Sequence, residues 1–230
     1  YAYHLDADLA GSVVKDSCKQ VKHIIATVDA DTLPEADLYI DCTGFRRELI
    51  KDKTLIEFEH HHINTSIVCP YELTTDVEPY TYSIARDHGW QFIINLQNRI
   101  GTGYCYSDRF VSDEDAMQEF LKYNQHLKIY KDSAPRTIKW HPSILKNSWQ
   151  NNVVAIGISS GFIDPLESNA LYMTQFQIAT LAKCIKENKS SAVYNRLINR
   201  VWMENSSYIL HHYMLSSRND TASVSYTHLR

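Results

Sequence analysis

The chain has 230 residues, of which 44% are hydrophobic and 22% charged, and its formal net charge is -4. These values are ordinary for a soluble globular protein with one large domain or two small ones. The sequence has no basic block, which argues against nucleic acid as the main partner, and no apolar run near the roughly 20 residues of a membrane span. Five scattered cysteines without a CxxC pair predict a reducing, cytoplasmic setting with neither a disulfide frame nor structural zinc.

Helices and strands are both expected along the chain. Apolar residues at helical spacing predict helices at residues 5–20, 46–50, 112–123, 169–187 and 192–215. Runs rich in β-branched and aromatic residues predict strands at 21–28, 36–44, 58–69, 136–141 and 152–157, and a hairpin at 90–107. Ser112 and Asp115 approximate a capping box for the third helix. The mixture predicts an α/β or α+β domain.

The segment "ADLYIDCTGF" is a strand that ends in small residues and Gly44. A glycine at a strand end allows close approach of the backbone to a ligand, and sheets that bind dinucleotides place ligands at the carboxyl ends of their strands. An ordinary tight turn explains the same residues. Spacing alone favours the ordinary turn.

The segment "NVVAIGISSGFIDPLES" takes a buried strand through a loop into a helix. Ser168 is predicted to cap this helix, which would leave free N–H groups at Asn169, Ala170 and Leu171 as an anion site. Glu167 lies at the edge of that site, whereas Asp164 is expected to order the turn. Alternatively, both carboxylates only favour the helix N-terminus electrostatically.

Two further patterns have structural explanations that are at least as good as the functional ones. The histidines of "FEHHHINT" and of "HHY" at 211–213 lack a second ligand cluster, so solvated or packed histidines are expected rather than a metal site. The hairpin aromatics fall on alternate positions, so each pair shares a face. That face is either core or the wall of an aromatic substrate pocket. These aromatics are Trp90, Phe92, Tyr104 and Tyr106.

In this order, "ADLYIDCTGF", "GWQFIINLQNRIGTGYCYS" and "VVAIGISSGFIDPLES" resemble the flavin-dependent tryptophan halogenase family. "YAYHLDADLA" and "RTIKWHPSILKNSWQNN" resemble the family as well, so the resemblance extends to about Asp220. It implies an α/β fold like that of FAD-dependent monooxygenases: a dinucleotide-binding sheet, an antiparallel substrate sheet and C-terminal helices. Residues 1–222 would form an incomplete halogenase domain, and 223–230 a non-native or truncated tail.

The resemblance also implies a chemistry. Reduced FAD, supplied by a separate flavin reductase, would react with oxygen and convert halide into hypohalous acid. A lysine and a glutamate would then direct this acid onto a small, electron-rich aromatic substrate such as tryptophan or another indole. Neither nucleic acid nor membrane is an expected partner, and a homodimer is left open.

Individual residues take roles from the family only where its motifs match. The matches are Glu167 as the catalytic glutamate; Gly44, Ile158, Ser168 and Leu171 at the flavin; and the amides of Asn169 and Ala170 at the halide. The aromatic substrate pocket is assigned to Trp90 and Phe92 because they share a strand face.

Three departures from the family pattern keep other functions open. The family motif Trp-x-Trp-x-Ile-Pro reads Trp90-Gln91-Phe92-Ile93-Ile94-Asn95 here, which leaves open monooxygenation without halogenation. Asn169-Ala170 replaces the usual Thr-Gly or Thr-Ser, which points to a shifted halide preference. The glycine loop GxGxxG and the catalytic lysine are expected upstream of Tyr1, so this piece alone should bind FAD poorly and be inactive. A non-catalytic remnant is the third alternative.

Overall fold

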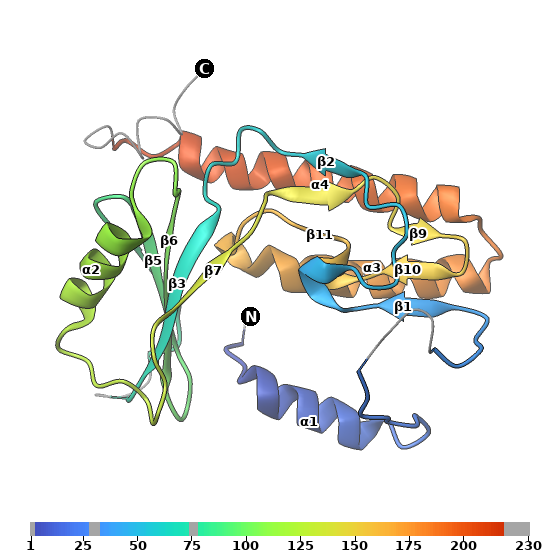
Figure 1. The fold of residues 1–230 in the computed structure, drawn as a ribbon, viewed down its shortest axis with the longest axis horizontal. Helices are drawn as coiled ribbons and strands as arrows, with labels where there is room; N and C mark the ends of the chain where they lie inside the picture. Colours follow the sequence, from blue (N-terminus) through green and yellow to red (C-terminus); the bar gives the residue numbers. More distant parts are fainter. Residues whose placement is uncertain (1–2, 28–32, 74–77, 219–230) are drawn as a thin grey trace. The chain divides into compact units, whose positions relative to one another are not determined.

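The computed structural model describes residues 3–27, 33–73 and 78–218 (Figure 1). They fold into two units. The first unit contains residues 3–27 and 65–139, and the second contains residues 33–64 and 140–218. Each unit has its own buried core.

The first unit is built on a five-stranded antiparallel sheet with the strand order β4-β5-β6-β3-β7. Its strands are β3 (Thr65–Tyr71), β4 (Tyr82–Ala85), β5 (Gly89–Asn95), β6 (Ile100–Tyr106) and β7 (Arg136–Lys139). Helix α2 (Asp113–Asn124) packs on one face, where Phe120 joins Ile67 and the two hairpin tyrosines in the core. Full burial of an aromatic ring of this size stabilises the fold by about 1.5–3 kcal/mol.

The first unit also contains helix α1 (Ala7–Ser17), none of whose residues is buried. The carboxylate of Asp6 caps this helix by accepting from the N–H groups of Asp8 and Leu9. Arg99, which follows β5, pairs with the same carboxylate at 3.4 Å.

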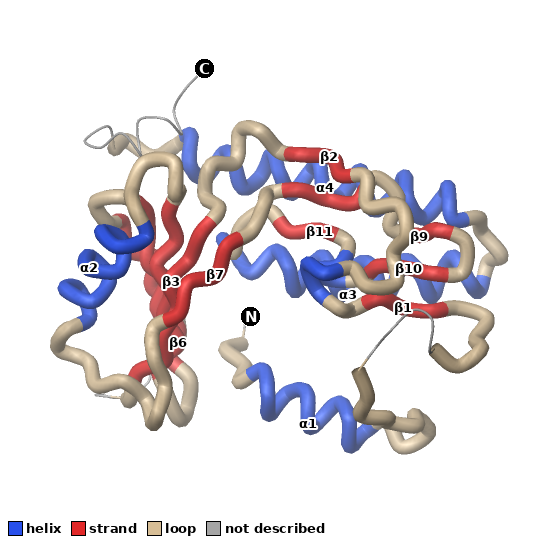
Figure 2. The backbone as a smooth tube through the Cα atoms, in the orientation of Figure 1, coloured by secondary structure: helices blue, strands red, loops and turns tan. Residues whose placement is uncertain are grey.

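The second unit contains two small sheets and two long helices (Figure 2). In one sheet, β1 (Tyr39–Asp41) runs parallel to β10 (Val153–Ala155), and β9 (Trp149–Gln150) pairs with β10. The other sheet has the order β11-β8-β2, with β11 (Gly161–Phe162), β8 (Ser143–Leu145) and β2 (Leu55–Glu57). Helices α3 (Asn169–Lys186) and α4 (Ser191–Met214) bury Met173, Ile198 and Trp202 against these strands. Three 3-10 turns complete it: η1 (Gly44–Arg46), η2 (Gly157–Ser159) and η3 (Leu166–Ser168).

Most of the predicted elements are present. The hairpin, the strands at 39–41, 136–139 and 153–155, and the helices at 7–17, 113–124, 169–186 and 191–214 are confirmed. Ser112 caps α2 as predicted, because its hydroxyl accepts from the N–H of Asp115. Along with the mixed sheets and C-terminal helices, this confirms the predicted α/β fold class.

Three predicted elements are wrong or displaced. Residues 21–27 form no strand and are exposed, because nothing in the described chain pairs with them. A 3-10 turn at Gly44–Arg46 replaces the short helix predicted at 46–50. The strand predicted at 58–69 begins only at Thr65.

No helix within the described ranges is long and apolar enough to cross a membrane. The predicted tail at 223–230 lies outside the described residues.

Candidate active site

The carboxyl ends of the parallel strands β1 and β10 meet at the buried side chain of Asp41. Its carboxylate accepts hydrogen bonds from the N–H and hydroxyl of Thr43, the N–H of Leu49 and the hydroxyl of Ser159, at 2.7–3.1 Å. Burial raises the pKa of Asp41, but these hydrogen bonds outweigh burial and hold the pKa below its ordinary value. Asp41 is therefore a buried anion that fixes the two strand ends together.

Ser159 connects the loop after β10 to the loop after β1. Its hydroxyl oxygen also accepts from the N–H of Gly44 at 2.9 Å, and its carbonyl accepts from Nε of Arg47 at 2.9 Å. Gly44 has φ +74°, and the space that a Cβ would occupy is open. Beside it, Ile158 leaves 39% of its surface exposed. The two strand ends thus present a glycine and an apolar side chain to the outside.

Helix α3 is attached to the same loop. The side chain of Gln177 accepts from the N–H of Gly157 at 2.8 Å. A Cβ at Gly157, which has φ +68°, would lie 3.3 Å from the Thr174 hydroxyl. Helix α3 therefore contacts the loop after β10 through Thr174 and Gln177, and Leu171 in its first turn is 65% exposed.

The turn before α3 is strained at two consecutive residues. Glu167 has φ 57° and ψ 18°, and Ser168 has φ 54° and ψ 30°, which are left-handed conformations that cost about 1–2 kcal/mol for a residue with a Cβ. Both residues are exposed to solvent. Strain of this kind gathers at functional sites, where the surrounding structure maintains it.

The predicted capping arrangement at this turn is wrong in two respects. Ser168 makes no capping hydrogen bond, because its left-handed backbone does not have the extended conformation of an N-cap. The N–H of Asn169 is not free either, since it donates to the carbonyl of Leu166, as does the Asn169 side chain at 2.9 Å. Of the predicted anion-binding amides, Ala170 and Leu171 therefore remain in the first turn of α3.

Asp164 orders the turn, as predicted. Its carboxylate is buried and accepts from the N–H of Leu166 at 2.8 Å. The hydroxyl of Tyr213, in the last turn of α4, donates to its other oxygen at 2.8 Å. Burial raises the pKa of Asp164 to about 6, although both hydrogen bonds act in the opposite direction.

The histidine-rich segments have different environments. The ring of His61 is buried and lies 2.8 Å from the hydroxyl of Ser206, and burial lowers its pKa to about 4. His212 is exposed, and its Nε2 lies 4.0 Å from the carboxylate of Glu167. No group of three or more potential metal ligands occurs in the part of the chain that the structure describes.

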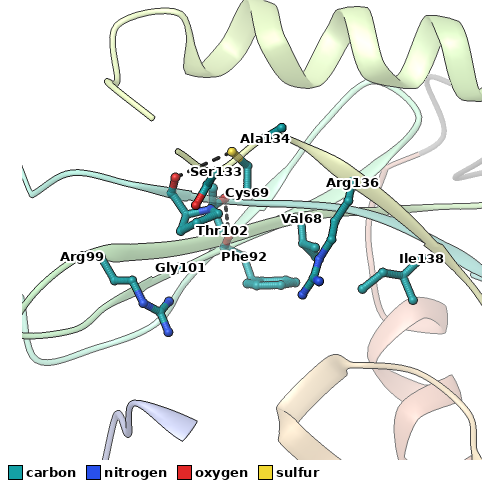
Figure 3. Close-up of a pocket in the computed structure, with 11 residues that line it drawn as sticks. Val68, Cys69, Phe92, Arg99, Gly101, Thr102, Ser133, Ala134, Arg136 and Ile138 are labelled. Carbon is teal, nitrogen blue, oxygen red and sulfur yellow. Dashed lines mark hydrogen bonds between the residues drawn. The ribbon is translucent and has the colours of Figure 1, made fainter. Parts of the chain in front are cut away.

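The two remaining predicted site residues lie in the first unit, on the face of the sheet opposite α2. Trp90 and Phe92 are half-buried neighbours with ring centroids 6.0 Å apart, whereas the Tyr104 and Tyr106 pair is buried on the α2 side. Phe92 lines a groove of about 610 Å³ and lies between Arg99 and Arg136 (Figure 3). Trp90 is not one of the lining residues.

Sequence reasoning missed Asp41, Ser159 and Tyr213. The sequence signal for Asp41 was a carboxylate at a strand end followed by Thr43 and Gly44, which is the pattern of a side chain that accepts from the following turn. Ser159 and Tyr213 had no local signal, because their partners lie 118 and 49 positions away.

Comparisons with known proteins identify the family and the fold. The sequence profile of the tryptophan halogenase family matches residues 8–226. The chain is 30% identical to tryptophan 7-halogenase RebH of Lentzea aerocolonigenes, over 96% of this chain and 47% of RebH. The crystal structure of tryptophan 6-halogenase SttH from Streptomyces toxytricini superposes with a TM-score of 0.85 at 26% identity, over 97% of this chain and 49% of that one.

A second structure has the same fold. Xcc4156, a flavin-dependent halogenase from Xanthomonas campestris, superposes with a TM-score of 0.77 at 28% identity, over 84% of this chain and 40% of that one. The chain spans about half the length of the curated relatives it matches. Since the family profile covers nearly the whole chain and the fold agrees, this chain belongs to the tryptophan halogenase family.

Proposed function

We propose that the protein containing this chain is a flavin-dependent halogenase that acts on an electron-rich aromatic substrate such as an indole. The observation that carries the proposal is the exposed Glu167 on a strained turn, at the start of the helix attached to the ends of β1 and β10. Membership in the tryptophan halogenase family supports this reaction class for the protein that contains the chain.

The residues at the strand ends fit a flavin ring. Gly44 leaves its Cβ position open, and the exposed side chains of Ile158 and Leu171 offer apolar contact to a planar ring. The sequence contains no GxGxxG, so the cradle of the ADP half would come from other parts of the protein. When bound, FAD reduced by a separate flavin reductase supplies, with oxygen, the oxidising power that converts halide into hypohalous acid.

The first turn of α3 fits a halide ion through fewer amides than the sequence predicts. Because the N–H of Asn169 donates to Leu166, the halide would be held by the amide of Ala170, with that of Leu171 beside it. The Ser168 side chain, which caps nothing, would lie between the halide and the flavin as the family motif implies. The positive end of the α3 dipole favours an anion at this position.

Glu167 would act on the oxidised halogen and on the aromatic ring. Its exposed carboxylate can accept a hydrogen bond from hypohalous acid or hold a protonated lysine supplied by the rest of the protein. It would also stabilise the positive charge that develops on the aromatic ring during attack.

We assign the substrate pocket to Trp90 and Phe92. These two side chains share one face of the sheet, and Phe92 lines a groove there.

The test uses the intact gene product with a flavin reductase, FAD, and chloride or bromide, and a panel of indoles. Mass spectrometry of the products should show the halogen isotope pattern. Glu167→Gln should reduce kcat by at least 100-fold, because the amide cannot take up a proton or carry a charge. Glu187→Gln is the matched control, because Glu187 is exposed just beyond the other end of α3.

The alternatives predict different products. A hydroxylated product that forms equally well without halide would indicate a monooxygenase rather than a halogenase. The departure from the family motif at Gln91-Phe92 leaves this function open. Flavin binding without turnover of any substrate would indicate a non-catalytic protein. Equal activity of wild type and Glu167→Gln would remove Glu167 from the mechanism.

A further inference from the structure

The strained turn that carries Glu167 has to be maintained by contacts from outside it. Glu167 and Ser168 are consecutive left-handed residues with side chains, and neither has φ and ψ values that such residues favour in isolation. The exposed Glu167 makes no hydrogen bond within the turn in the described structure, so its own side chain does not stabilise this conformation. The contacts on the preceding residues decide whether the turn persists.

Asp164 makes those contacts. Its side chain is 2% exposed, and its two oxygens accept one hydrogen bond from the N–H of Leu166 and one from the hydroxyl of Tyr213. The first bond closes the turn on itself, and the second ties it to another helix. A buried carboxylate that loses a donor incurs a large penalty, so the two bonds fix its position.

Tyr213 comes from the last turn of α4, and its ring packs against the core of the second unit. The adjacent His212 lies beside Glu167, and its Nδ1 donates to the carbonyl of Tyr208 in the preceding turn of the helix. The end of α4 therefore reaches the turn at two points: a buried one at Asp164 and an exposed one at Glu167. Only the buried contact is a hydrogen bond, at 2.8 Å, because Nε2 of His212 lies 4.0 Å from the Glu167 carboxylate.

We propose that Tyr213 is a positioning residue for Glu167, whose hydroxyl holds the Asp164 carboxylate and thereby the turn that presents the Glu167 side chain. The catalytic meaning of this assignment rests on the proposed function. The structural role of Tyr213 in holding residues 164–168 does not depend on the proposed function.

The first experiment measures the turn directly in the intact gene product. Hydrogen–deuterium exchange in a peptide covering residues 163–171 should be at least fivefold faster in Tyr213→Phe than in wild type. Tyr208→Phe is the matched control, because it also removes one tyrosine hydroxyl from α4. Tyr208 is exposed, and its ring contact with His212 is retained in this variant. Unchanged exchange at 163–171 in Tyr213→Phe would overturn the proposal, even if the protein proves not to be a halogenase.

The second experiment measures the consequence for Glu167. Tyr213→Phe should lower kcat by 10-fold or more and leave KM for the aromatic substrate within twofold, because the substrate pocket is unchanged and the glutamate is misplaced. Adding Tyr213→Phe to Asp164→Asn should have little further effect, because both act through one hydrogen bond. Full additivity of the two substitutions, or loss through KM alone, would contradict positioning through Asp164. If the wild type halogenates nothing, the proposed function fails and the exchange result alone decides the role of Tyr213.

Discussion

The hydroxyl of Ser159 donates to the buried carboxylate of Asp41, 118 positions earlier in the chain, with 3.1 Å between the oxygens. The same hydroxyl accepts from the N–H of Gly44 at 2.9 Å. One small side chain thus satisfies a buried anion and a backbone donor at the ends of two parallel strands. These two loops carry Gly44 and Ile158, the residues that we assign to the flavin.

Replacing Ser159 by alanine should weaken this junction. Asp41 loses a donor and Gly44 loses an acceptor, so the free energy of unfolding should fall by about 1–3 kcal/mol. Denaturant unfolding of the intact gene product measures the change, and a flavin titration should show weaker binding. Ser190→Ala is the control, because Ser190 is exposed and makes no capping hydrogen bond. Equal stability of the two variants would contradict a structural role for Ser159.

Asp164 should make the protein less stable as the pH rises. Its pKa in the folded state is about 6, above the ordinary value of 3.8 for an aspartate, so the folded state binds its proton more tightly than the unfolded state does. The stabilising contribution is complete below about pH 4 and is lost as the pH rises through 6, up to about 3 kcal/mol in total. Asp164→Asn should remove this part of the pH dependence, measured as the free energy of unfolding at pH 4.5 and 7.5.

Tyr213→Phe provides an internal check on the Asp164 prediction. The Tyr213 hydroxyl lowers the pKa of Asp164 by hydrogen bonding to its carboxylate, so its removal should move the transition to higher pH. A transition at the same pH in wild type and Tyr213→Phe would show that this hydrogen bond does not form in solution.

Local signals explain which parts of the fold could be predicted. The hairpin at 89–106 and the Ser112 cap of α2 depend on neighbouring residues, so pattern and propensity sufficed. The predicted cap at Ser168 is absent, because Asp164 and Pro165 lead into a 3-10 turn whose left-handed end does not have N-cap geometry. The Asp41–Ser159 contact needs the parallel pairing of β1 and β10, and strand pairing over such a separation is not encoded locally.

His61 should have the opposite pH effect to Asp164. Burial lowers its pKa to about 4 from the ordinary histidine value of 6.5, so the unfolded state takes up its proton first as the pH falls. Its contribution to stability is complete above about pH 6.5 and is lost as the pH falls through 4, up to about 3 kcal/mol in total. His61→Gln should reduce this acid sensitivity, whereas His60→Gln, at an exposed neighbour, should leave it unchanged. Denaturant unfolding between pH 4 and 7 compares the two, and equal acid sensitivity in both would contradict burial of the His61 ring.

Replacing Gly103 by alanine should destabilise the protein, because the new methyl group would displace a side chain that lines the groove in Figure 3. A Cβ at this position would lie 2.3 Å from Cζ of Phe92 and 3.1 Å from Cγ1 of Val68, both of which line the groove. The ring of Phe92 would have to swing away, and overpacking of this kind costs about 1–3 kcal/mol. Gly101→Ala is a control on the same strand, because its Cβ would meet no atom closer than 3.7 Å. Thermal or denaturant unfolding should separate Gly103→Ala from Gly101→Ala by at least about 1 kcal/mol. Equal stability would mean that Phe92 does not cover Gly103, and the assignment of Phe92 to the substrate pocket would lose its structural support.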